Sequence, residues 1–221
     1  MLLSKEDNTN EYKVKNIRHL QGNAYILQLE RNGLEFKSGQ HVQIATLNNY
    51  NLREYSIYSG VHDGYLEILI KVVADGYLSN RLKNAKPGDY VQLYGPIGYF
   101  TIDKKNLHKP FLFIASGSGI APFHSFVSSY SNLNYTLIHG VKYHYEGYEK
   151  KFYAKEKYIQ CTSQDTMGNY SGRLTQYIEE NSFDFNSEVY LCGNNLMIAD
   201  AMNILVQKGF RREQMHTEVY F

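Results

Sequence analysis

The residues Arg53-Glu54-Tyr55-Ser56 place a guanidinium, a phenol ring and a hydroxyl close together in the chain. Apolar and polar residues alternate around them, which predicts a β-strand with side chains two residues apart lying about 7 Å apart on one face. Arg53 and Tyr55 would then be neighbours. Such a pair suits a flat, phosphorylated cofactor, because the ring can stack on it and the guanidinium can bind a pyrophosphate bidentately. An ordinary half-exposed sheet edge shows the same pattern more often, so the rest of the chain must decide.

A glycine motif, Gly117-x-Gly119-x-x-Pro122, follows the apolar run 111–115 and opens a segment with a helical pattern. Glycines let a backbone approach a pyrophosphate closely, and a helix N-terminus supplies free amide donors. Nucleotide binding and a simple turn explain the motif about equally well, and Pro122 departs from the usual dinucleotide fingerprint.

Two further positions have both a chemical and a structural interpretation. The amides and hydroxyl of Gly76-Tyr77-Leu78-Ser79 suit a second phosphate, although Ser79 as a helix cap is the more common role. Cys192-Gly193 ends an apolar strand, where open α/β sheets bind ligands, whereas a buried structural cysteine is the default.

Four polar residues follow the second and third strands of the second half, or precede its next helix: Lys142, Ser163, Gln164 and Arg173. Together they suit a ribose phosphate, although each alone is more often a solvated surface residue. The final residues, Glu218-Val219-Tyr220-Phe221, include two aromatic rings that are expected to pack on the core or on a cofactor.

Composition narrows the classes of protein. A hydrophobic content of 43%, a charged content of 20% and a net charge of +1 indicate a soluble globular protein without a bulk charge for nucleic acid or an anionic membrane. Two cysteines are too few for an iron–sulfur cluster, and the histidines show no metal spacing, so we expect no metal and an organic cofactor. Without a signal peptide or a spanning apolar run, a cytoplasmic location is expected.

The periodicity predicts two domains. In the first half, β-rich runs at residues 14–17, 24–29, 41–45, 54–58, 65–73 and 90–94 are separated by turn residues, with a helix signal at 78–82. This pattern is typical of an antiparallel six-stranded β-barrel. From about residue 108, strands 111–115, 135–139, 158–162, 188–192 and 216–221 alternate with helices 123–129, 174–180 and 196–208. We therefore predict a barrel (1–107) followed by an α/β doubly wound parallel sheet (108–221).

The chain resembles the ferredoxin-NADP reductase family from about Tyr12 onward, in the order and intervals of six motifs: Arg53-x-Tyr55-Ser56, Gly76-x-x-Ser79, Gly95-Pro96-x-Gly98-x-Phe100, Gly117-x-Gly119-x-x-Pro122, Cys192-Gly193 and Glu218-x-Tyr220. The resemblance implies a flavin-binding barrel followed by a pyridine-nucleotide domain. It also implies non-covalent FAD bound by Arg53, Tyr55, Ser56, Ile57, Lys71, Val73, Gly76, Leu78, Ser79, Tyr220 and Phe221. For NADP(H) it implies binding by Gly117, Gly119, Pro122, Lys142, Ser163, Gln164, Arg173, Cys192 and Gly193.

Within this scheme Tyr55 stacks on the flavin, and Tyr220 covers its other face until nicotinamide enters. Ser56, Cys192, Glu218 and Tyr220 are the implied catalytic residues. The implied activity is hydride transfer at flavin N5 that exchanges electrons between NADP(H) and a separate ferredoxin or flavodoxin, by a monomer. Relatives that select NADPH commonly carry serine followed by arginine where this chain has Ser163-Gln164, so NAD(H) stays open although NADPH is favoured.

Two alternatives remain at this point. One is an NAD(P)H:flavin or ferric reductase that uses flavin as a diffusing substrate. The other is an electron-transfer subunit of a larger complex, against which the ending Glu218-Val219-Tyr220-Phe221 counts, because it lacks a cysteine cluster.

Overall fold

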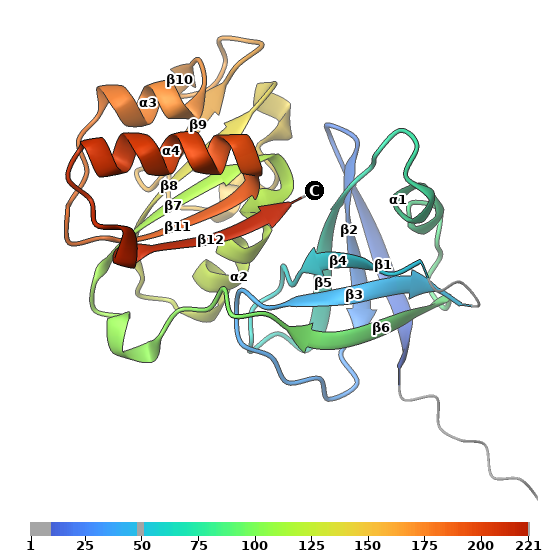
Figure 1. Cartoon of the computed structure of the whole chain (residues 1–221). Helices are drawn as coiled ribbons and strands as arrows, with labels where there is room; N and C mark the ends of the chain where they lie inside the picture. Colours follow the sequence, from blue (N-terminus) through green and yellow to red (C-terminus); the bar gives the residue numbers. More distant parts are fainter. Residues whose placement is uncertain (1–9, 48–50, 221) are drawn as a thin grey trace, which may run out of the picture.

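The computed structural model of the chain describes residues 10–47 and 51–220. Its first sheet has the strand order β4-β3-β6-β1-β2-β5 (Figure 1). The strands are β1 (Glu11–Leu20), β2 (Ala24–Glu30), β3 (His41–Thr46), β4 (Arg53–Ser56), β5 (Tyr65–Lys71) and β6 (Tyr90–Ile97), with helix α1 (Tyr77–Leu82) between β5 and β6. All its strand pairs are antiparallel, and a bridge between Ile57 and Ile68 joins the edge strands. The predicted antiparallel barrel is confirmed.

Alternating apolar side chains fill the barrel, including Tyr25, Leu27, Leu29, Ile44, Ile57, Ile68 and Leu93. Its turns use residues that tolerate a left-handed backbone, such as Gly22 and Asn23, whose φ angles are 73° and 58°. Strand β6 is longer than expected. The predicted strand ends at residue 94, but β6 continues to Ile97, which still pairs with His41 of β3.

The second sheet is parallel, in the order β10-β9-β8-β7-β11-β12. Its strands are β7 (Pro110–Ser116), β8 (Asn134–Val141), β9 (Tyr158–Thr162), β10 (Tyr170–Ser171), β11 (Glu188–Asn194) and β12 (Met215–Tyr220). The predicted parallel α/β sheet is confirmed, with β10 as an added short strand. The predicted division at residue 107 falls within the connection between β6 and β7.

Helices cover both faces of this sheet (Figure 1). They are α2 (Ala121–Ser129), α3 (Leu174–Glu180) and α4 (Asn195–Gln207). Leu112 and Ile114 pack with α3 and α4, whereas Phe113 of the same strand packs with α2. This alternation explains the continuous apolar run in β7, since a strand buried on both faces needs apolar residues at every position. Among the described residues, no helix is long and apolar enough to span a membrane.

The core beneath α2 continues into the barrel. Ile26, Tyr58 and Leu69 of the first sheet's domain belong to the same buried cluster as Phe123 and Phe126 of α2. At its centre the ring of Tyr58 stacks on His124 of α2, with centroids 3.7 Å apart. His124 Nδ1 lies 2.8 Å from the Tyr58 carbonyl oxygen, and Ser125 Oγ donates to the Ser59 carbonyl oxygen at 2.7 Å. Helix α2 is therefore fastened to the barrel by both packing and hydrogen bonds.

Ion pairs also cross the contact between the barrel and the second domain, which we call the domain seam. Arg18 of β1 binds Glu149 of the second domain at 2.9 Å. Lys71 of β5 donates to Glu146 Oε1 at 3.0 Å, while Glu146 Oε2 accepts the backbone N–H groups of Lys142 and Tyr143. Burial alone would raise the pKa of Glu146, but these hydrogen bonds outweigh burial and hold that pKa below its ordinary 4.5.

The buried His124 predicts a loss of stability in mild acid. Burial lowers its pKa from 6.5 to about 4, so between these values the unfolded chain binds a proton that the folded chain does not. His124→Gln keeps an N–H donor for Tyr58 but does not titrate. We expect the variant to lose about 2 kcal/mol less unfolding free energy than the wild type between about pH 7 and about pH 5. Urea denaturation at the two pH values measures this difference. His62→Gln, at an exposed position, should keep the wild-type dependence, and an unchanged dependence in His124→Gln would contradict the assignment.

Candidate active site

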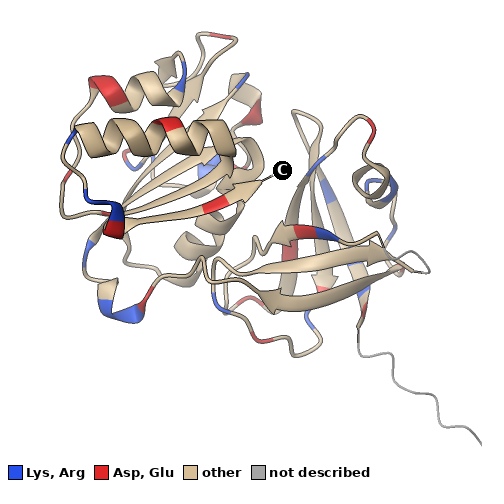
Figure 2. Ribbon diagram, in the orientation of Figure 1, with Lys and Arg blue, Asp and Glu red and all other residues tan. Residues whose placement is uncertain are grey.

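The four implied catalytic residues converge where β4 of the barrel meets β12 of the parallel sheet. Tyr220 Oη donates to Ser56 Oγ at 2.6 Å, and Ser56 Oγ donates to Glu218 Oε2 at 2.8 Å. Cys192 of β11 is paired with Glu218 and has its Sγ 3.9 Å from Glu218 Oε2. Figure 2 shows charges of both signs on β4 and an acidic residue on β12. The chain thus joins residues that are more than 160 positions apart into one hydrogen-bonded cluster.

Burial keeps two residues of this hydrogen-bonded cluster protonated. It raises the pKa of Tyr220 and of Cys192 well above their ordinary values of 10.0 and 9.0. The phenol is therefore a neutral donor, and the thiol is not a thiolate nucleophile. Cys192 is fully buried, so its place in the site is that of a small, uncharged group.

His41 of β3 is a member of the cluster that the sequence interpretation missed. It pairs directly with Ser56 in the β3–β4 register, and its Nδ1 lies 3.5 Å from Glu218 Oε1. The interaction with Glu218 raises the pKa of His41 above 6.5, against the opposing effect of burial. The strand register brings His41 to the site, and neither its residue type nor its spacing from Ser56 indicates that register.

The exposed side of β4 provides groups that suit FAD. Arg53 and Tyr55 alternate with Ser56 along the strand, so they project from the other side of it. Arg53 is exposed, and Tyr55 packs partly against the barrel core. Burial raises the pKa of Tyr55 to about 12, with Arg53 opposing. An exposed guanidinium beside a half-exposed neutral ring fits a flat, phosphorylated cofactor.

The remaining residues expected to bind FAD differ in their exposure and in their contacts. The side chain of Ile57 is in the barrel core and its N–H donates to Gln40, while the ammonium of Lys71 binds Glu146. Val73 is exposed, and Ser79 Oγ accepts the Val73 N–H at 3.2 Å.

Gly76 is the N-cap of α1, and Leu78 is buried beneath the helix. Ser79 holds the β5–α1 loop from within the first turn of the helix, and the helix cap that the sequence favoured at Ser79 is wrong, because the N-cap is Gly76 without a side-chain cap. Phe221 lies outside the described residues.

The glycine motif lies directly against the end of β11. A Cβ on Gly119 would come 2.3 Å from the Cys192 carbonyl oxygen, and one on Gly193 would come 2.2 Å from Ser116 Oγ. Gly117 has a φ of 53° and Pro122 lies in the first turn of α2. The glycines therefore allow two backbone segments to touch at the carboxyl edge of the sheet.

His139 of β8 binds the backbone of the glycine motif through its imidazole ring. Its Nε2 donates to the Gly117 carbonyl oxygen at 2.8 Å, so its Nδ1 accepts from Tyr158 Oη, also at 2.8 Å. Burial lowers the pKa of His139 to about 4, which keeps this neutral tautomer. His139 is therefore a buried structural residue that supports the loop.

The four residues expected at a ribose phosphate gather at the same edge. The Gln164 N–H donates to the Lys142 carbonyl oxygen at 2.8 Å, and the Ser163 N–H donates to Val141. Arg173 caps α3 directly after Gly172, whose N–H binds Thr162 of β9. All four side chains are exposed.

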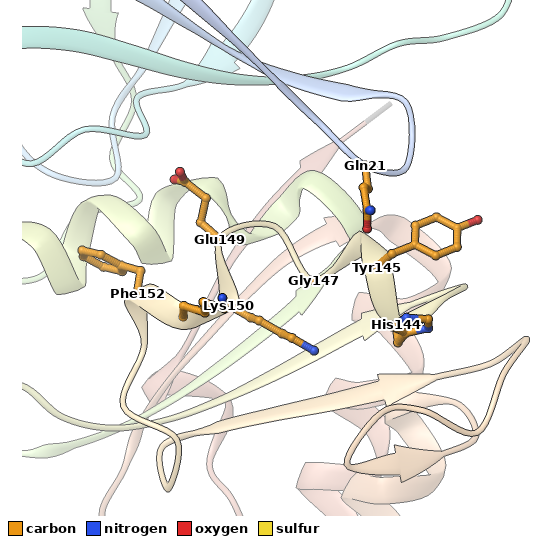
Figure 3. Close-up of a pocket in the computed structure, with 8 residues that line it drawn as sticks. Gln21, His144, Tyr145, Gly147, Glu149, Lys150 and Phe152 are labelled. Atoms are coloured by element: carbon orange, nitrogen blue, oxygen red, sulfur yellow. The ribbon is translucent and has the colours of Figure 1, made fainter.

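A separate hollow of about 620 Å³ lies at the domain seam (Figure 3). It is lined by Gln21, His144, Tyr145, Gly147, Glu149, Lys150, Lys151 and Phe152. None of the predicted site residues lines it.

Comparisons with known proteins agree with this geometry. Residues 13–102 match the model of the oxidoreductase FAD-binding domain. A flavodoxin/ferredoxin-NADP reductase of Buchnera aphidicola subsp. Schizaphis graminum is 29% identical, over 88% of this chain and 91% of that protein. The toluate 1,2-dioxygenase electron transfer component of Pseudomonas putida is 28% identical over 94% of this chain, which spans 66% of that protein. The structure of ferredoxin-NADP+ reductase from Plasmodium falciparum with 2'P-AMP superposes with a TM-score of 0.80 and 26% identity, over 95% of this chain and 96% of that one.

The chain is similar to ferredoxin-NADP reductases over nearly its full length, and its first domain matches the FAD-binding domain of oxidoreductases. The matched domain is that of an FAD-binding oxidoreductase, and the Buchnera and Plasmodium proteins are both named as NADP reductases. The predicted resemblance to this family, the enzyme class and the cofactors agree with these comparisons. The individual roles of the site residues stay predictions.

The contact between the glycine motif and β11 predicts a sharp difference between two glycine variants. Gly119→Ala should lower the free energy of unfolding by about 1 to 3 kcal/mol, because its Cβ would overlap the backbone of Cys192. Gly64→Ala has no atom within 4 Å of the added carbon and should change stability by less than about 0.5 kcal/mol. Urea denaturation compares them, and equal stability of the two variants would refute the close approach.

Proposed function

We propose that the chain catalyses electron exchange between NADP(H) and a separate one-electron carrier protein, ferredoxin or flavodoxin, with non-covalent FAD. The observation that carries this proposal is the Tyr220–Ser56–Glu218 cluster, which joins the last strand of one domain to the flavin strand of the other. The Buchnera relative, named for this activity, supports it over nearly its full length.

Bound FAD would supply the chemistry, since it exchanges a hydride with a nicotinamide and single electrons with a carrier. Arg53 would bind the pyrophosphate, and the ring of Tyr55 would hold one face of the flavin. Tyr220 would cover the other face, anchored by its hydrogen bond to Ser56, and would move aside for nicotinamide. Ser56 and Glu218 would hold and move the proton at the reacting edge. The small thiol of Cys192 would leave room for nicotinamide.

The groups at the nucleotide edge favour NADPH. Lys142 and Arg173 supply two positive charges for a 2'-phosphate, although Gln164 lacks one. A carboxylate nearby, Asp165, would repel a phosphate, but its Oδ2 accepts hydrogen bonds from the backbone and ring of His144. We therefore propose a higher kcat/KM for NADPH than for NADH.

A second candidate is the reductase component of an oxygenase system. It is favoured by the similarity to the toluate dioxygenase component, which extends over 94% of this chain. Anaerobic reduction of the purified protein by NADPH, followed by addition of ferredoxins and flavodoxins from the same source, separates the two. Rapid reoxidation by one of these carriers is expected, whereas reoxidation only by an oxygenase component would favour the second candidate. A colourless protein that needs added flavin would overturn both.

The two aromatic residues should have separable effects. Tyr55→Ala should weaken FAD retention by removing a stacking surface, which contributes on the order of 1 kcal/mol beyond buried area. Tyr220→Ser should chiefly change nicotinamide affinity and turnover. Flavin release on dilution and steady-state kinetics measure the two effects. Circular dichroism controls for folding, and unfolding of both variants would show that the rings are core residues instead.

A positive charge at position 164 should increase the preference for NADPH over NADH. Hydrogen bonds to charged groups contribute on the order of 1.5 to 3 kcal/mol, and solvent at this exposed edge reduces that value. Gln164→Arg should therefore lower KM for NADPH by roughly threefold to tenfold and leave KM for NADH nearly unchanged. Gln207→Arg adds the same charge on exposed α4 and serves as the control. A wild-type preference for NADH, or an equal effect of both variants, would exclude the proposed phosphate site.

A further inference from the structure

The carboxylate of Glu146 binds both domains at once. Its Oε1 accepts the ammonium of Lys71 of the barrel at 3.0 Å, and its Oε2 accepts the backbone N–H groups of Lys142 and Tyr143 at 3.0 and 3.1 Å. The last two residues begin the loop 142–146, which we call the Lys142 loop. The side chain of Glu146 is 8% exposed. Burial would raise its pKa, but these hydrogen bonds hold the pKa below 4.5, so the group is ionised at neutral pH.

The backbone that Glu146 binds is held in turn against the loop that follows β9. The Lys142 carbonyl oxygen accepts the Gln164 N–H at 2.8 Å. Further along the Lys142 loop, the His144 N–H donates to Asp165 Oδ2 at 2.8 Å. Three consecutive backbone N–H groups of this loop therefore bind carboxylates. Because these donors are already occupied, only side chains of the segment remain to bind a phosphate.

Contacts on two sides limit the movement of Glu146 and of the loop that it binds. A Cβ on Gly22 in the β1–β2 turn would come 2.7 Å from Glu146 Cγ, so this glycine leaves the space that the side chain fills. In the second domain, Gln160 Nε2 donates to the His144 carbonyl oxygen at 2.7 Å. Glu146 is therefore held between the turn of the barrel and the Lys142 loop.

We propose that Glu146 is a positioning residue that determines how strongly the chain prefers NADPH to NADH. This proposal rests on the proposed function, in which Lys142, Gln164 and Arg173 lie around the 2'-phosphate. Glu146 fixes the backbone of Lys142, and through it that of Gln164, so that both side chains keep one orientation toward the phosphate. Lys71 holds Glu146 from the barrel. The buried carboxylate itself does not contact the nucleotide.

The variant Glu146→Gln breaks this contact with little change in shape. A carboxylate has two acceptor oxygens, whereas the amide of glutamine has one acceptor oxygen and an NH2 group that only donates. The variant can therefore accept either the Lys71 ammonium or the N–H groups of Lys142 and Tyr143, and not both. A donor that faces another donor is unfavourable, so the connection between the barrel and the Lys142 loop should be lost.

The first test measures nucleotide binding by the full chain with FAD and needs no carrier protein. Isothermal titration calorimetry should show that the wild type binds 2'-phospho-AMP more tightly than AMP. Glu146→Gln should weaken binding of 2'-phospho-AMP by roughly threefold to tenfold, as expected for partial loss of one solvent-screened charged hydrogen bond, and leave AMP binding nearly unchanged. KM for NADPH should rise in parallel, with KM for NADH and both kcat values nearly unchanged. Equal weakening of both ligands would indicate a general structural role and overturn the proposal.

Two further variants accompany this test. Glu149→Gln removes a carboxylate from the same domain seam, but its oxygens bind Arg18 and Tyr58, so it should keep the wild-type ratio of the two affinities. Lys71→Met removes only the ammonium of the barrel and should shift the ratio in the same direction as Glu146→Gln, by less because the two backbone hydrogen bonds remain. Lys71→Met also decides the matter if Glu146→Gln folds poorly, since an unchanged ratio in folded Lys71→Met would overturn the proposal.

The second test follows the loop without any nucleotide, by amide hydrogen exchange measured with NMR. The Gln164 N–H, which donates to the Lys142 carbonyl oxygen, should exchange faster in Glu146→Gln than in the wild type, and at the wild-type rate in Glu149→Gln. A wild-type rate at Gln164 in Glu146→Gln would overturn the proposal. A wild type that binds AMP as tightly as 2'-phospho-AMP would instead overturn the proposed preference for NADPH, and the exchange rates would still decide whether Glu146 positions the loop.

Discussion

The packing of α2 against the barrel is the interaction on which the site depends. Ser56 belongs to one sheet and Tyr220 to the other, so their 2.6 Å hydrogen bond exists only while the two sheets keep a fixed separation. The stacked rings of Tyr58 and His124 hold that separation close to the site, because Tyr58 follows Ser56 by only two residues. A shift of α2 by one ångström would break the contact, and such misplacements are costly for catalysis.

Backbone contacts give a similar rigidity to the glycine motif, where the sequence predicts nucleotide binding. The glycine motif touches the end of β11, and the buried His139 fixes the Gly117 carbonyl group from beneath. Neither feature presents a reactive side chain. Both determine where the amide groups at the start of α2 lie, and a dinucleotide is bound largely by such groups. This part of the site is therefore positioned by buried residues that present no reactive side chain.

The sequence predicted both sheets because alternation and continuous apolar runs are local signals. It also singled out Ser56, Cys192, Glu218 and Tyr220, which the structure brings together, since these lie within motifs that resemble those of the family. It could not identify His41, whose position follows from the pairing of β3 with β4. It also assigned Lys71 to FAD, whereas the ammonium binds Glu146, a residue 75 positions away. Pairings between strands and ion pairs between the two domains leave no local pattern, so the sequence does not indicate them.

The ion pairs across the seam have a consequence for recombining domains between relatives. Glu146 is held by Lys71 of the barrel and by the backbone of the Lys142 loop, and Arg18 binds Glu149 close by. A chimera that joined this barrel to the second domain of a relative would leave Arg18 and Lys71 facing a surface selected for different partners. Arg18 would keep Glu67 of its own domain as a counter-ion, whereas the partly buried ammonium of Lys71 would lose Glu146, which is unfavourable. Each domain therefore has its own sheet, but the ion pairs between the two domains are matched only when both come from this chain.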